Sequence, residues 1–446
     1  MPKRVPFLLL LWSLATVAHA AGPSVTVYSR DLGFVRESRA LAGRTGRDTV
    51  RLENVSNRLD FSSVRLAPAA GRVTRLAYRW DTASGDAFVE KAIGERVRVV
   101  SRGNRVAEGV LVSADASWLV LRGDDGTVST QSREAVEEVR LSQARASLSL
   151  RPAIEAILEG AKAPTTGELS YLTGGLSWSC EHQLVRTGET SGTWSARVVV
   201  ENTTGRSFED ARLKLVAGEP ARTGAMPGPV EAKMMRTMAM SSDAGEGAAL
   251  TEASFADYHL YTLPGTATLR DRESQSLVMI EPRPVRLAPR YVYRGGDPRG
   301  IAIQLEMVNS AKEGAGVPIP AGRVRCFQPD DDKELQFTGE TNVGHKALDE
   351  KVTLDIGHAF DLAAERKTTT DRRVSDRERE FSVEIKLRNR KPAAARIVVE
   401  ETIGGDVQVT AQSSPSTRKD ANTMQWTLDV PPGKEVVLTY TARQRW

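Results

Sequence analysis

Five of the nine methionines in this 446-residue chain stand close together. They are Met226, Met234, Met235, Met238 and Met240, in a stretch that is also rich in Ala, Gly and Pro. Thioether sulfur is a ligand that Cu(I) prefers, so Met234, Met235, Met238 and Met240 form one candidate metal site. The alternative, which we favour, is a flexible loop over residues 221–256 that holds no ligand, because its composition offers no core-forming pattern.

The chain has two cysteines, Cys180 and Cys326. An oxidising compartment permits one disulfide between them, and closing so long a loop would stabilise the fold by about 4 kcal/mol. The alternative is two separate buried thiols in strands, because the sequence does not show that the two Cα atoms come within bridging distance.

The histidines and acidic residues form no recognisable reaction motif. Asp330–Asp332 has three consecutive carboxylates without the alternate spacing of a calcium loop, so it predicts a solvated turn. Asp361 follows His358 by three residues and precedes Glu365 by four, but neither pair stands in a context that assigns it catalysis. We therefore expect no catalytic residue and no cofactor. The histidines beyond residue 20 also lack zinc-site spacing, and they are His182, His259, His345 and His358.

The first 20 residues, MPKRVPFLLLLWSLATVAHA, have the pattern of a secretory signal peptide. Lys3 and Arg4 precede an apolar stretch, and Ala18-His19-Ala20 presents small residues at a cleavage site. The alternative is a leader that stays attached as an anchor. No later stretch is long and apolar enough to span a membrane. We expect a periplasmic or secreted protein, cleaved near Ala20, with no stable membrane span.

The composition limits the class of partner. Hydrophobic residues make up 40% of the chain and charged residues 26%, which is typical of a globular protein and excludes wholesale disorder. The chain has 61 basic and 57 acidic residues. Two of the basic residues, Lys3 and Arg4, lie in the leader, so the chain without its leader is nearly neutral. A nearly neutral chain does not favour a nucleic-acid partner.

Period-two alternation of apolar and polar residues predicts an all-β, multidomain protein. In the C-terminal part, strand-length segments recur every 8–12 residues or so, which is typical of an immunoglobulin-like or fibronectin-like β-sandwich. The best helical candidate is Ile154–Ala161, although a strand is also compatible with that short run. The expected organisation is a signal peptide at 1–20, an N-terminal β region at 21–85, a small β-barrel at 86–142, a central β-sandwich at 143–350 and a C-terminal β-sandwich at 351–446.

Residues 86–142 form a distinct unit in this pattern. Five short strand-like runs lie between Val97 and Leu141, with the hairpin signal Asp124-Asp125-Gly126 before the fourth. Such a series predicts a small SH3-like or Sm-like barrel inserted near the N-terminus. Barrels of this kind sometimes bind RNA or peptides, but a structural insertion is favoured because no aromatic cluster accompanies the charges.

Seven segments, which we call the family blocks, carry a resemblance to a known family: Leu169–Trp178, Val200–Phe208, Ala211–Gly218, Pro320–Arg325, Gly357–Asp361, Ala364–Lys367 and Tyr440–Trp446. They resemble the bacterial exported family called domain of unknown function 4139, which is mucoidy-inhibitor-like. Where that family often has small-x-Tyr after the Trp of the first block, this chain has Cys180-Glu181-His182. The resemblance implies an exported β-rich protein and no particular reaction.

These patterns favour a non-enzymatic binding or scaffolding component of the bacterial cell envelope, with an envelope protein or a glycan as its partner. Sandwich sheets present rigid faces and loop-lined ends, which suit such contacts. Two alternatives stay open: an envelope hydrolase whose carboxylates the sequence does not locate, and a copper-handling protein that uses the methionine-rich segment.

Overall fold

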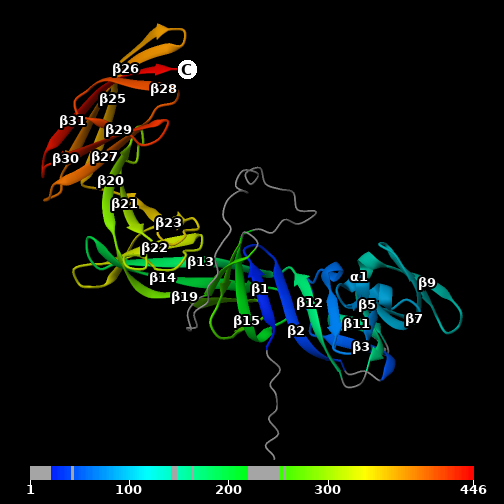
Figure 1. Cartoon of the computed structure of the whole chain (residues 1–446). Coiled ribbons are helices and arrows are strands. Elements are labelled where there is room, and N and C mark those ends of the chain that lie inside the picture. Colours follow the sequence, from blue (N-terminus) through cyan, green and yellow to red (C-terminus); the bar gives the residue numbers. More distant parts are fainter. Residues whose placement is uncertain (1–21, 42–44, 142–147, 162–164, 219–250, 256–257) are drawn as a thin grey trace, which may run out of the picture. The chain divides into compact units, whose positions relative to one another are not determined.

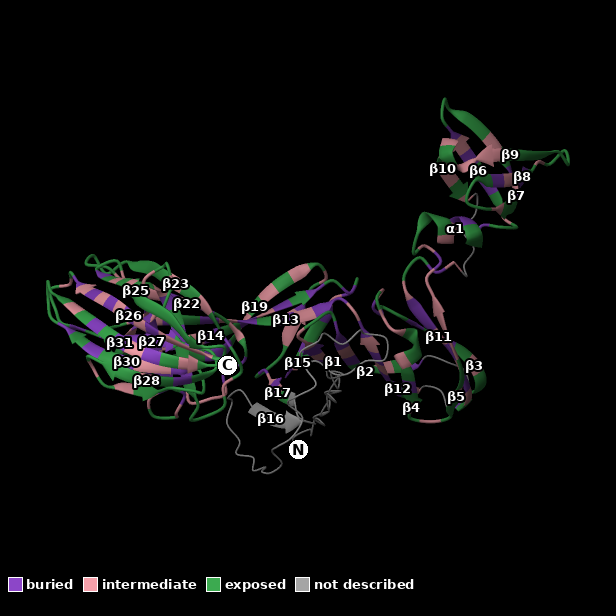
Figure 2. Cartoon of the chain, turned by 90° about the horizontal axis from the view of Figure 1, so that it is seen from above, coloured by how far each residue is buried: buried purple, intermediate pink, exposed green. Residues whose placement is uncertain are grey.

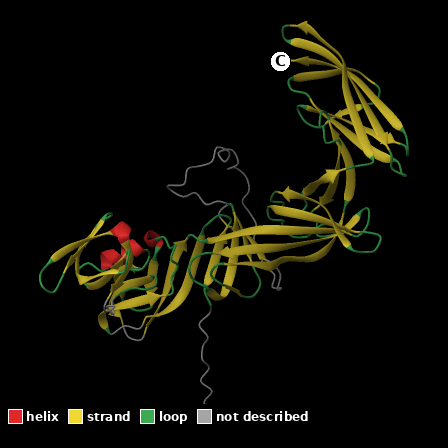
Figure 3. Cartoon of the chain, turned by 180° about the vertical axis from the view of Figure 1, so that it is seen from behind, coloured by secondary structure: helices red, strands yellow, loops and turns green. Residues whose placement is uncertain are grey.

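The computed structural model describes residues 22–41, 45–141, 148–161, 165–218, 251–255 and 258–446. Strands dominate this part of the chain, and its helices are short (Figure 3). None of them has the length and hydropathy needed to cross a membrane. The leader and the five clustered methionines lie outside the described residues. So does the expected flexible loop up to residue 250, whereas Thr251–Phe255 is a strand, β16, that pairs with β17, Tyr258–Thr262.

The chain forms two compact units, each of which takes up several separate segments of the sequence. Figure 1 labels elements of both units along the chain. Of the described residues, unit 1 contains those up to residue 177 together with 201–214 and 265–273, and unit 2 contains those within 178–200, 215–264 and 274–446. Both units are therefore assembled from segments that are far apart in the sequence. The units are described separately below.

Unit 1 is built on two sheets. In unit 1 the first, eight-stranded sheet runs from β15 through β1, β2 and β12 to β4, with β18 also pairing β15, and the second has the order β3-β11-β5. A short 3-10 helix, η1, covers Phe61–Ser63. The strands are β1 Ser24–Tyr28, β2 Gly33–Leu41, β3 Gly46–Glu53, β4 Arg65–Pro68, β5 Arg72–Arg79, β11 Ala153–Ala161, β12 Thr165–Thr173, β15 Phe208–Ala217 and β18 Ala267–Leu269.

The helix predicted for Ile154–Ala161 is wrong, because these residues belong to β11. This strand is the centre of its sheet, where Ile154 pairs with Leu52 on one side and with Tyr78 on the other. Two neighbours satisfy its backbone hydrogen-bonding groups, and this tertiary pairing outweighs a helical spacing of only three apolar residues.

An inserted module lies between β5 and β11. Its sheet has the order β10-β6-β7-β8-β9. The edge strands β9 and β10 do not pair with each other, so the sheet is open where a small SH3-like or Sm-like barrel was expected. The 3-10 helix η2, Arg133–Ala135, carries the chain from one edge strand to the other. The module contains α1 Gly85–Lys91, β6 Arg96–Ser101, β7 Arg105–Ala114, β8 Trp118–Arg122, β9 Val128–Ser132 and β10 Val136–Leu141.

Helix α1 was not expected from the sequence. The Ser84 hydroxyl caps it by accepting a hydrogen bond from the Ala87 N–H at 3.0 Å. Asp86 in its first turn and Lys91 in its last turn complement the helix dipole. Val89 and Ala92 pack onto the apolar face of the five-stranded sheet and close the core of the module.

Unit 2 contains a central sheet and two C-terminal sheets. The central sheet has the order β19-β14-β13-β22-β23. The C-terminal sheets have the orders β24-β21-β20-β27-β30-β29 and β25-β26-β31-β28. The central strands are β13 Leu176–Arg186, β14 Ser191–Asn202, β19 Glu273–Arg286, β22 Gly322–Pro329 and β23 Leu335–Val343. The C-terminal strands are β20 Ala288–Arg294, β21 Ile301–Val308, β24 Lys351–His358, β25 Leu362–Ser375, β26 Glu378–Asn389, β27 Ala395–Thr402, β28 Asp406–Gln412, β29 Ser416–Arg418, β30 Thr423–Val430 and β31 Glu435–Arg445.

The two C-terminal sheets pack as the expected β-sandwich. Buried residues alternate with intermediate or exposed ones along β26, β30 and β31 (Figure 2). Trp426 of one sheet stacks on Tyr440 of the other, with ring centroids 4.8 Å apart, in the centre of the shared core. This sandwich also includes β20 and β21, which precede residue 351 in the sequence.

Two bulged strands, β23 and β24, join the central sheet to the sandwich within unit 2. The ladder shifts register next to Gly339 of β23 and next to Gly357 of β24, and both residues have a φ near +155°. A Cβ atom at Gly339 would overlap the Ile356 carbonyl oxygen. Only glycine fits a position that combines this φ with such close contact between backbones.

Candidate functional site

Of the sequence-derived candidates, His259 and His345 come together: their rings stack with centroids 6.1 Å apart. His182 is buried in β13, whereas His358 and Asp361 are exposed at the end of β24 and in the turn that follows it. Glu365 forms an ion pair with Arg388 at 3.1 Å. Among the residues that the structure describes, no group of three His, Cys, Asp or Glu side chains could hold a metal ion.

The three consecutive aspartates lie in the β22–β23 turn. The Asp330 carboxylate accepts backbone hydrogen bonds from Asp332 and Glu334 at 3.1 and 2.9 Å, and another from the Gln336 side chain. These hydrogen bonds, that from Gln336 foremost, hold the pKa of Asp330 below its usual value. Its oxygens close the turn, as the sequence predicts for a solvated turn.

Both cysteines are free, buried thiols in the structure. In the parallel β13–β22 pair, Cys180 is opposite Gly322 and Cys326 is opposite Leu184, four residues further along. At about 3.3 Å per residue this offset is about 13 Å, well beyond the Cα separation of a disulfide. Burial raises the pKa of each thiol to about 12.

Three polar contacts involve residues of the family blocks, and the first, which is buried, joins β2, β12 and the β14–β15 loop in unit 1. Arg206 donates two hydrogen bonds to the Glu37 carboxylate, at 2.9 and 3.0 Å, and one to the Tyr171 hydroxyl at 3.0 Å. Its guanidinium lies 4.7 Å from the centroid of the Phe208 ring. Burial raises the pKa of Tyr171. Two family blocks, those of Tyr171 and Arg206, therefore share one charged contact in the core.

The second contact joins β13 to β22. Glu181 accepts hydrogen bonds from Arg323 at 2.9 and 3.1 Å and from Arg325 at 2.8 Å, and the bond from Arg323 foremost lowers the pKa of Glu181. On the opposite face, His182 Nε2 lies 2.9 Å from the Pro320 carbonyl oxygen. Burial lowers the pKa of His182 to about 4, so at neutral pH the ring is uncharged and Nε2–H donates.

The third contact lies in the C-terminal sandwich and is centred on Glu401, whose side chain is only 4% exposed. Arg366 Nε and Nη2 donate to its carboxylate at 2.9 and 3.1 Å, and the Tyr440 hydroxyl donates at 2.8 Å. A Cβ atom at Gly295 would overlap the same carboxylate, so glycine is required there. Burial raises the pKa of Tyr440, which therefore remains a donor. The hydrogen bond to Glu401 raises the pKa of Arg366.

A polar cleft opens beside Glu401, with a volume of about 330 Å³. Strands β25, β26 and β31 supply Arg366, Thr368, Asp371, Arg379 and Gln444 to its lining. The end of β27 and the residues after it supply Glu401 and Gly404. Arg379 Nε donates to the Gln444 amide oxygen at 3.0 Å, the Gln444 amide nitrogen donates to the Gly404 carbonyl at 2.6 Å, and Arg379 lies 3.5 Å from Asp371. Hydrogen bonds thus fix most of the lining, and its two positive and two negative charges balance.

Sequence reasoning missed this cleft. Arg366 and Tyr440, which bond to Glu401, are 35 and 39 residues from it along the chain, so only the folded topology brings the three side chains together. One signal was available: Glu400 and Glu401 directly follow the apolar run Ile397–Val399. A carboxylate that continues a buried strand requires a cationic partner, because an unpaired buried charge is very costly.

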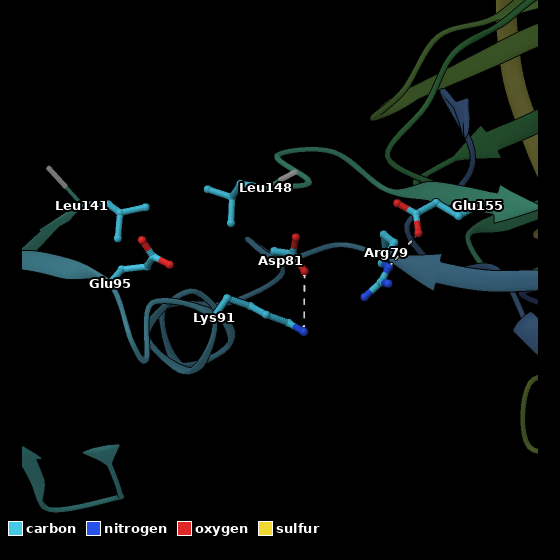
Figure 4. Close-up of a pocket in the computed structure, with 7 residues that line it drawn as sticks. All are labelled: Arg79, Asp81, Lys91, Glu95, Leu141, Leu148 and Glu155. Carbon is cyan, nitrogen blue, oxygen red and sulfur yellow. Dashed lines mark hydrogen bonds and ion pairs between the residues drawn. The ribbon is translucent and has the colours of Figure 1, made fainter. Parts of the chain in front are cut away.

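A second cavity, of about 230 Å³, lies in unit 1 where the inserted module joins β5 and β11 (Figure 4). Arg79 pairs with Glu155 at 3.0 Å, and Lys91 lies 3.9 Å from Asp81. Asp81 and Ser149 exchange two hydrogen bonds, from the Asp81 N–H to the Ser149 carbonyl and from the Ser149 N–H to the Asp81 carboxylate. These bonds tie the chain segment that enters the module to the one that leaves it.

The fold and these contacts define an all-β protein with a C-terminal β-sandwich, an inserted β module and buried polar contacts that join distant strands. Residues 168–446 match the family described as Domain of unknown function (DUF4139). This match covers more than half of the chain, which therefore belongs to that family. No curated protein matches the chain.

Proposed function

We propose that this protein is an exported, non-enzymatic component of the bacterial cell envelope, where it binds or scaffolds an envelope protein or a glycan. One observation carries the proposal: Glu37, His182 and Glu401, which are buried and ionisable, each bond to a residue that is distant in the sequence. Catalysis needs such groups directed at a substrate, whereas here their oxygens and nitrogens hold strands together. This use of buried charge suits a rigid platform for recognition.

The sequence of the first 20 residues supports export. A tagged full-length chain should appear in the envelope or extracellular fraction of a bacterial host, and Edman sequencing should show Ala21 as its first residue. A product that starts at Met1 and stays in the cytoplasm would contradict export.

The binding role is tested by crosslinking the mature protein in envelope extracts and identifying what it captures. Capture of a discrete envelope protein or glycan that unlabelled mature protein competes away supports the proposal. An assay of the same extract for newly released reducing ends, with buffer and heat-unfolded protein as controls, tests the hydrolase alternative. Catalytic release of reducing ends, or no competable capture, would refute the non-enzymatic binding role.

A further inference from the structure

We propose that the cleft beside Glu401 binds a neutral saccharide. This inference rests on the proposed binding function and names the ligand class for one site. The cleft lies in the C-terminal sandwich, between β25 and β26 on one side and the end of β27 on the other. Its volume of about 330 Å³ is at the lower end of the range for small-molecule sites.

The charges of the lining select against ionic ligands. Arg366 and Arg379 are positive, Glu401 and Asp371 are negative, and each cation lies within 3.5 Å of a carboxylate. An anionic ligand would meet two carboxylates, and a cationic ligand would meet two guanidinium groups. Neither charge gains a net attraction from a lining that is already balanced.

The polarity of the lining selects against apolar ligands. The side chains of Thr368, Asp371, Arg379 and Gln444 all carry hydrogen-bonding groups and line the cleft. An apolar ligand would remove water from these groups and give them no new partner, which is costly. A saccharide hydroxyl both donates and accepts, so a sugar ring supplies partners to guanidinium, amide and carboxylate groups at once.

The cleft also has the rigid base and adaptable rim that recognition requires. Glu401 is 4% exposed and is fixed by Arg366 and Tyr440, so the base is organised before a ligand arrives. At the rim, Arg379 and Asp371 are 42% and 52% exposed and 3.5 Å apart. An exposed ion pair of this kind contributes little stability, so the Asp371 side chain can turn towards a ligand at small cost while Gln444 holds Arg379 in place.

The test uses three soluble probes on the mature protein, measured by isothermal titration calorimetry and saturation-transfer difference NMR. N,N′-diacetylchitobiose is neutral, the corresponding glucosamine disaccharide is cationic, and digalacturonate is anionic. We expect the neutral disaccharide to bind most tightly. The inference is overturned if no neutral saccharide binds at 10 mM (about the weakest affinity that still amounts to specific recognition) or if either charged probe binds more tightly.

Variants at the rim locate the binding. Asp371→Asn and Arg379→Gln should each weaken saccharide binding about tenfold, because each removes a charge-assisted hydrogen bond. Arg396→Gln is the matched control, since it breaks an exposed ion pair with Asp429 elsewhere in the same sandwich and should leave binding unchanged. Equal binding by all three variants would overturn the assignment to this cleft, provided that their melting curves match that of the wild type.

The outcomes separate this inference from the proposed function. Competable capture of an envelope protein without saccharide binding would refute the saccharide site and leave the binding function standing. Cleavage of the disaccharide would refute the non-enzymatic function, and intact saccharide bound at the cleft supports both.

Discussion

Glu37 and Arg206 form a two-point ion pair at 2.9 and 3.0 Å, with only 8% and 6% of their side chains exposed. The two residues are 169 positions apart, and the pair joins β2 to the loop between β14 and β15. Removing one partner of a buried ion pair leaves the other charge buried without compensation, which strongly destabilises the fold.

Glu37→Gln should therefore destabilise unit 1 by about 3–5 kcal/mol, because it leaves the Arg206 charge buried and unpaired. Chemical denaturation of the variant and the wild type measures this difference. Glu168→Gln is the matched control: it removes an exposed ion pair with Arg36 from the same sheet and should cost about 1 kcal/mol or less. Equal effects of the two substitutions would contradict a structural role for the buried pair.

Gly339→Ala should disrupt the junction between the central sheet and the sandwich, since its Cβ would overlap the Ile356 carbonyl oxygen. We expect a loss of several kcal/mol in unfolding free energy, or a failure to fold. Gly344→Ala provides the control, because nothing lies within 4 Å of the added carbon and the residue has no positive φ. Thermal melting that is unchanged in both variants would refute the proposed contact.

His182 should make the fold sensitive to acid. Burial lowers the pKa of His182 from 6.5 to about 4 in the folded chain. Between these values the unfolded chain binds a proton that the folded chain does not, so stability is present above pH 6.5 and declines as the pH falls towards 4. The unfolding free energy lost through the titration of His182 alone is about 3 kcal/mol.

Denaturation midpoints at pH 7 and pH 4.5 check this dependence. His182→Gln keeps a side-chain donor for the Pro320 carbonyl but does not titrate, so its midpoint should fall less with acid than that of the wild type. An identical decline in both proteins would show that His182 does not contribute.

The two thiols should be inert in the folded protein, because burial raises the pKa of Cys180 and Cys326 to about 12. Ellman's reagent at pH 8 should detect no thiol in the native chain and both thiols after unfolding in guanidinium without a reductant. Detection of no thiol after unfolding would show a disulfide, contrary to their separation in the β13–β22 ladder.

Much of the all-β architecture follows from the pattern of apolar residues. Alternation from Leu176 to Leu184 predicts a strand with one buried face, and β13 has that burial pattern. The short segments were harder to assign, because Ile154–Ala161 carries too few turns of pattern to distinguish a helix from a strand. Helix α1 has seven residues, and within it only Val89 is buried, so its apolar face is too small to detect in the sequence.

The polar contacts were predictable only in part. The family blocks marked Arg206, Arg366 and Tyr440 as members of meaningful segments but did not indicate their partners. Glu37 precedes the first block, and Glu401 lies between the last two blocks. Strand order and register determine which carboxylate meets which arginine, and the positions of charged residues in the sequence do not reveal that order or register.

The interleaving of the two units limits where the gene can be cut. The family match begins at residue 168, inside β12, whose partners β2 and β4 both precede that residue. A recombinant fragment of residues 168–446 would also leave β15 without its neighbour β1. Unsatisfied strand edges and uncovered apolar side chains promote aggregation, so soluble expression of the family region needs the preceding β region as well.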